Sequence, residues 1–164
     1  LNEPEMFAAA APLSGFIFNA AVFEQVEAAK AKGSYPGVPV YMAAGTEGGT
    51  EWSICPVPLA EENSSGKTLS DWFALNDCTG SLDWSKINGS NETKGSLDWQ
   101  NGGAFTKSGR WYTMTCEKDG VPMVQAEIVD YMPHATMPEH SARVWNNWLS
   151  HYSRNADGTL VYNP

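Results

Sequence analysis

The sequence predicts an α/β fold, in which helices cover a sheet that contains buried parallel strands. A helical pattern over 21–32 ends at Gly33, and the apolar run 38–44 follows it and ends at Gly45. A continuous apolar strand after a helix is typical of an interior parallel strand that is covered on both faces. Helix, strand and glycine turn in this order indicate an α/β architecture.

Composition supports one globular domain over 1–164, since 42% of the residues are hydrophobic and only 18% are charged. A net charge of −9 repels phosphate backbones and anionic membranes, so we expect no nucleic-acid and no membrane partner. The chain begins at Leu1 without an initiator Met. We therefore expect either a removed leader or a longer protein.

The amino-terminal segment 5–14 is predicted to be the end of a helix that leads into a short buried strand, which stops at Gly15. In the helix at 21–32, acidic residues lie near the start and lysines near the end, with Gly33 just beyond. This distribution agrees with the helix dipole and a glycine C-cap.

The segment 61–109 is an insertion rich in Asn, Ser and Gly, with a short helix predicted at 68–76. The pentapeptide Gly-Ser-Leu-Asp-Trp occurs at 80–84 and again at 95–99. Two copies are too few for a solenoid. We interpret them as the arms of a hairpin-like excursion, and coincidence within a loop is the alternative.

The next two segments predict a β-hairpin. The β-rich runs 111–116 and 121–129 flank Asp119-Gly120, and a turn of this composition between two such runs is a strong hairpin signal.

The last helix is predicted from a capping box formed by Thr136 and Glu139, with Pro138 in the first turn. A buried face of this helix is predicted from apolar residues at i, i+3, i+4 and i+7, namely Trp145, Trp148, Leu149 and Tyr152. After the helix, we expect an irregular tail over 155–164.

His134 is the principal candidate for catalysis, because it lies between a strand end and a helix start. Ligands gather at the carboxyl ends of strands in open α/β sheets, and an imidazole there can act as a general base. His140 and His151 are expected on the helix surface. The spacing of His134, Glu139 and His140 fits no usual zinc pattern, so we expect no metal site.

Three segments carry a family resemblance. The run 129–145, Val-Asp-Tyr-Met-Pro-His-Ala-Thr-Met-Pro-Glu-His-Ser-Ala-Arg-Val-Trp, resembles the histidine segment of the feruloyl esterase, acetylxylan esterase and polyhydroxyalkanoate depolymerase group, with Pro133 in place of the usual Gly. The segment 6–15 is similar to the one that follows the nucleophile helix in that group. The segment 38–47 is similar to the strand and turn that deliver the triad acid.

The resemblance implies the carboxyl-terminal half of an α/β-hydrolase three-layer sandwich, in an exported carboxylic-ester hydrolase. His134 is then the triad histidine. The family places an Asp where this chain has Gly48, so the acid is Glu47, one residue earlier, or Glu51, or neither. No Gly-x-Ser-x-Gly is present, so we expect the serine upstream, on an amino-terminal half in cis or in trans, and an inactive isolated chain. The implied substrate is an ester, of plant cell-wall polysaccharide or of a polyester, and no cofactor is implied.

The three cysteines match no metal-ligand spacing. We expect a disulfide between Cys78 and Cys116, which suits an oxidising compartment, and Cys55 is then left for a partner elsewhere. The sequons at Asn63, Asn88 and Asn91 mark polar loops, and their use is left open.

A non-catalytic carbohydrate-binding or interaction module is the alternative function. It would account for the seven tryptophans, the acidity and the missing nucleophile. Several aromatic residues either form a cleft for phenolic or sugar rings or serve packing: Trp52, Trp84, Trp99 and Tyr131.

Overall fold

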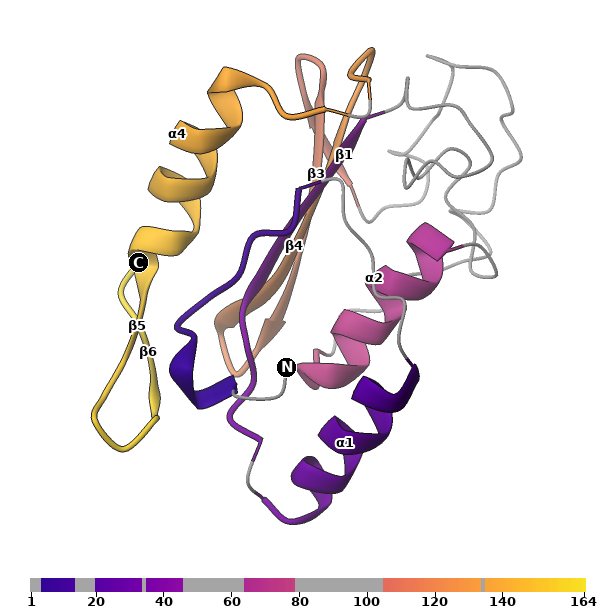
Figure 1. Cartoon of the computed structure of the whole chain (residues 1–164). Helices are drawn as coiled ribbons and strands as arrows, with labels where there is room; N and C mark the ends of the chain where they lie inside the picture. The colour runs from indigo at the N-terminus through magenta and orange to yellow at the C-terminus, as the bar shows by residue number, and fades with distance from the viewer. Residues whose placement is uncertain (1–3, 14–19, 34, 46–63, 79–104, 134) are drawn as a thin grey trace.

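The computed structural model describes residues 4–13, 20–33, 35–45, 64–78, 105–133 and 135–164 (Figure 1). In chain order its elements are η1 (Pro4–Met6), α1 (Ala20–Ala31), β1 (Val40–Gly45), α2 (Ser64–Leu75), β2 (Thr106–Ser108), β3 (Trp111–Lys118), β4 (Val121–Val129), α4 (Pro138–Asn147), η2 (Leu149–His151), β5 (Tyr152–Arg154) and β6 (Leu160–Tyr162).

The main sheet has the strand order β1-β4-β3-β2, and β1 and β4 run parallel. On the other edge of β1, Ala10 and Leu13 form parallel bridges to Val40 and Ala43. Strand β1 is therefore interior, with an extended segment on one side and β4 on the other. This confirms the buried parallel strand expected at 38–44. The helix end and short buried strand expected within 5–14 are replaced by the 3-10 turn η1 and two isolated bridges, and residues 8–13 are only half-buried.

Helices lie on both faces of this sheet. Helices α1 and α2 lie on one side and α4 on the other (Figure 1). Successive side chains of β1 point to opposite faces of the sheet. Val40 packs in the core on the side of α1 and α2, and Tyr41 packs with Val144 of α4 on the other side. This alternation follows from the two-residue period of a strand. The predicted α/β architecture is confirmed.

The β3–β4 hairpin is also confirmed. Asp119 and Gly120 both have positive φ, 53° and 78°, as a two-residue type I′ turn requires. Strand β3 continues to Lys118, past the predicted end at 116, across a register shift between Cys116 and Glu117.

Helix α2 confirms the helix predicted at 68–76, although it begins at Ser64. Its buried side includes Leu69, Trp72 and Phe73. Both Gly-Ser-Leu-Asp-Trp copies lie outside the described residues. The predicted insertion ends too late at 109, because Thr106–Ser108 form strand β2 and pair with β3 in the main sheet.

The predicted start of α4 is wrong by one residue. Met137 is the N-cap, and the His140 ring accepts the Met137 N–H. With this start Pro138 takes the first helical position, which proline favours. Thr136 and Glu139 therefore do not form the expected capping box.

The predicted buried face of this helix is wrong in part. The helix ends at Asn147, and Trp148 leaves helical geometry with φ −141° and ψ −76°. Residues after that point no longer follow helical spacing. Trp148 and Tyr152 are buried, but Trp145 is 60% exposed.

The tail is not irregular, as had been expected, because β5 and β6 form an antiparallel hairpin. Gly158, with φ 84°, lies in its turn. Arg154 ties the hairpin to the body through a hydrogen bond of 2.6 Å to the carbonyl of Phe7. Strands of three residues are too short for hydrophobic alternation to reveal them.

Candidate functional site

The carboxyl ends of β1 and β4 meet at one edge of the sheet. Their parallel register pairs the last residues of the two strands, Gly45 and Val129. The two strands therefore end side by side, one at Gly45 and the other at Val129. In an open α/β sheet this edge is where ligands bind.

A close backbone contact joins these two segments. A Cβ built on Gly45 would clash with the carbonyl oxygen of Met132, so only glycine permits this approach. Met132 is completely buried. Glu47 follows Gly45 by two positions and His134 follows Met132 by two, and both predicted residues lie outside the described residues.

The predicted catalytic side chains themselves, those of His134, Glu47 and Glu51, lie outside the described residues, and so do Trp52, Trp84 and Trp99. Tyr131 is described, at the same sheet edge. It is 66% exposed and has φ 58°, an uncommon conformation for a bulky residue.

A buried charged network missed by the sequence analysis lies beneath α4. Glu127, near the carboxyl end of β4, accepts hydrogen bonds from the Tyr41 hydroxyl and the Arg143 guanidinium. The Glu127 side chain is fully buried, and Arg143 also lies over the Trp111 ring at 4.1 Å. Burial, and then the hydrogen bond with Glu127, raises the pKa of Tyr41.

This network anchors α4 to the sheet, and α4 follows directly after the loop that holds His134. The sequence did contain a signal for it. Glu127 interrupts the otherwise largely apolar strand 121–129, and a carboxylate in such a place requires a buried partner.

His140 is buried and not on the helix surface, where it had been expected. Because Met137 is the N-cap, His140 occupies the third helical position and faces the sheet. Its Nδ1 accepts the Met137 N–H at 3.1 Å, and its ring meets Trp111 edge-on at 5.4 Å. The ring is therefore neutral, with the proton on Nε2, which has no hydrogen-bond partner in the structure.

We expect the free energy of unfolding to decrease as the pH falls below 6.5. Burial is the main cause that lowers the pKa of His140 from 6.5. The carboxylates of Glu127 and Glu139 oppose this shift, and the guanidinium groups of Arg143 and Arg110 add to it. The unfolded chain then binds a proton before the folded chain does, so acid favours unfolding until the folded-state pKa is passed.

Urea unfolding on either side of pH 6.5 measures this effect. The matched variant is His140→Gln, since Gln in the third helical position can accept the same N–H but does not titrate. A pH slope in this variant as steep as that of the parent chain would assign the effect to other groups.

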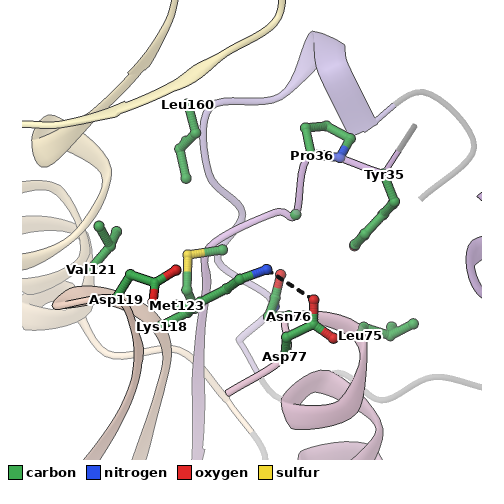
Figure 2. A pocket seen from close by; sticks show the side chains of 11 residues that line it. Tyr35, Pro36, Leu75, Asn76, Asp77, Lys118, Asp119, Val121, Met123 and Leu160 are labelled. Atoms are coloured by element: carbon green, nitrogen blue, oxygen red, sulfur yellow. Dashed lines mark hydrogen bonds and ion pairs between the residues drawn. The ribbon is translucent and has the colours of Figure 1, made fainter. Parts of the chain in front are cut away.

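A cavity of about 180 Å³ lies at the other end of the strands, near the amino ends of β1 and β4 (Figure 2). Lys118 and Asp77 form an ion pair of 2.9 Å in its lining. Its other lining residues are Tyr35, Pro36, Gly37, Leu75, Asn76, Asp119, Val121, Met123 and Leu160. None of these belongs to the segments around Glu47 and His134.

Among the described residues no cluster of His, Cys, Asp and Glu could hold a metal ion. Within the same part of the chain, no helix has the length and apolar character needed to cross a bilayer. No protein-family model, curated protein or solved structure significantly matches the chain.

Proposed function

We propose that this chain is the carboxyl-terminal part of an exported serine carboxylesterase with an α/β-hydrolase fold. His134 is the triad histidine and Glu47 the triad acid, with Glu51 as the alternative. The serine comes from a Gly-x-Ser-x-Gly segment upstream. The substrate is a carboxylic ester, carried by a plant cell-wall polysaccharide or a polyester.

The observation that carries the proposal is the contact between Gly45 and Met132 at the carboxyl ends of two neighbouring parallel strands. A triad needs its acid and its histidine within hydrogen-bond reach. In this chain Glu47 follows the end of β1, and His134 follows the end of β4 later in the sequence. The order acid and then histidine is the order of α/β-hydrolases, in which the serine precedes both.

Contacts of the segments before and after His134 support its proposed role as the triad histidine. On one side Met132 is buried against Gly45. On the other side α4 is tied to the sheet through Arg143 and Glu127. Catalysis depends on preorganised groups, and anchored segments on both sides of a catalytic residue favour such preorganisation.

The proposed reaction is acyl transfer through a serine ester. His134 takes the proton of the serine hydroxyl as it attacks the ester carbonyl, and then protonates the departing alcohol. Water then releases the acid, again with His134 as general base. The acidic partner holds the imidazole in the correct tautomer and stabilises its cationic form. No cofactor takes part in these steps.

Hydrolysis of a chromogenic short-chain ester tests the proposal and identifies the acid. The protein used is the chain together with its upstream segment. We expect Glu47→Gln to lower kcat by a factor of about 10⁴, as a wrong histidine tautomer does in serine hydrolases, and Glu51→Gln to change it little.

The reverse pattern would assign the acid to Glu51. Undiminished turnover in both variants would show that neither carboxylate serves a triad. Binding to insoluble polysaccharide without any ester hydrolysis by the joined protein would favour the non-catalytic module instead.

A further inference from the structure

Two cysteines that are far apart in the sequence are neighbours in the structure. Cys78 follows the last turn of α2, and Cys116 is buried within β3. The disulfide predicted between them is not formed in the structure. Cys78 packs against the core cluster that contains Cys116. The neighbouring Asp77 pairs with Lys118, two residues beyond Cys116 in β3.

The backbone around Cys78 is held in place by contacts to three elements. Asp77 pairs with Lys118 of β3 at 2.9 Å, as Figure 2 shows, and with Lys30 of α1 at 2.6 Å. The Asn76 side chain accepts the N–H of Val38 at 2.9 Å, next to β1. The Cys78 N–H binds the carbonyl of Phe73 at 3.0 Å. The end of α2 is therefore fixed against β3 without a covalent bond.

We propose that Cys78 and Cys116 form a reversible structural disulfide when the folded protein meets a low-molecular-weight disulfide such as oxidised glutathione. The half-buried Cys78 is the entry point, and the buried Cys116 resolves the intermediate. This inference does not depend on the proposed esterase activity.

The exchange proceeds in two balanced steps. The Cys78 thiolate attacks one sulfur of the glutathione disulfide, which forms a mixed disulfide and releases one glutathione thiolate. The Cys116 thiolate then attacks Cys78 Sγ, which forms the Cys78–Cys116 bond and releases the second glutathione. The two protein thiols are oxidised, and the small disulfide is reduced to two thiols, which take up the two protons.

Burial raises the pKa of the Cys78 thiol, and so does the hydrogen bond with Cys116. The reactive thiolate is therefore scarce, and the reaction is slow. Such a pair suits a structural cross-link and not a rapid redox catalyst. The bond would close the loop that contains the Asn/Ser/Gly-rich segment 79–104, and closing a long loop restricts the unfolded chain most.

The test is oxidation of the full, folded chain with oxidised glutathione, followed by peptide mapping without reduction and by thermal unfolding. We expect a Cys78–Cys116 cross-linked peptide and a midpoint raised by about 10 °C, both reversed by dithiothreitol. The parent chain and a Cys55→Ser variant should behave alike, while Cys78→Ser should show neither change.

Cross-linking of Cys55 to either residue in the folded parent chain would overturn the assignment. Persistence of both thiols after prolonged oxidation of the Cys55→Ser variant, shown by alkylation of Cys78 and Cys116, would overturn it as well.

Discussion

Replacing His134 by alanine is expected to lower kcat/KM for a short-chain ester by a factor of about 10⁴ or more in the chain joined to its serine-bearing segment. Without the imidazole, nothing removes the proton from the serine hydroxyl or returns one to the leaving alcohol. Steady-state hydrolysis of a chromogenic ester measures the loss.

His151→Ala is the matched control for this variant. The His151 ring contacts the carbonyls of Asn146 and Asn163 at 2.9 and 2.8 Å, and so belongs to the packing of the carboxyl-terminal hairpin. We expect this control to retain its turnover at a temperature where it remains folded. Turnover in His134→Ala equal to that of the control would remove His134 from the mechanism.

Removing one member of the buried ion pair is expected to cause the largest change in stability. Glu127→Met leaves the Arg143 guanidinium, which packs on Trp111, without its counter-charge, and leaves the Tyr41 hydroxyl without its acceptor. Because the Arg143 side chain is 32% exposed and water can partly replace its partner, we expect a loss of about 1–3 kcal/mol in the free energy of unfolding. Urea unfolding measures it.

The double variant with Glu127→Met and Arg143→Met separates pairing from packing. Since it leaves no unpaired charge, its loss should be much smaller than the sum of the two single losses. Tyr41→Phe, added to the double variant, should restore part of the free energy of unfolding that the double variant still lacks. This third change removes the Tyr41 hydroxyl, which no longer has a hydrogen-bond acceptor. Additive losses in the double variant would show that Glu127 and Arg143 act independently.

Features that depend on neighbouring residues were predictable from the sequence. The helix at 21–32 follows from its charge distribution and Gly33, and the β3–β4 turn follows from Asp119-Gly120. Both rest on backbone preferences and local hydrogen bonds, which act over a few residues. The interior strand at 38–44 was also predictable, because a strand buried on both faces shows an unbroken apolar run.

The predictions from sequence are wrong where a shift of one residue, or a contact with a distant segment, decides the structure. Thr136 and Met137 both precede Pro138 closely, and packing on the sheet selected Met137 as the N-cap and so turned His140 inward. The β5–β6 hairpin depends on distant contacts such as that of Arg154 with Phe7. Such contacts leave no periodic pattern in a short segment.

The sequence by itself determined the α/β class, the interior parallel strand and the chain order of Glu47 and His134, because these follow from local preferences and hydrophobic pattern. Only the tertiary structure decided which segments meet. Gly45 against Met132, Glu127 under Arg143, and Cys78 beside Cys116 each join residues far apart along the chain. The physical reason is that strand pairing and helix packing bring distant segments together, and one segment's composition does not specify its partner.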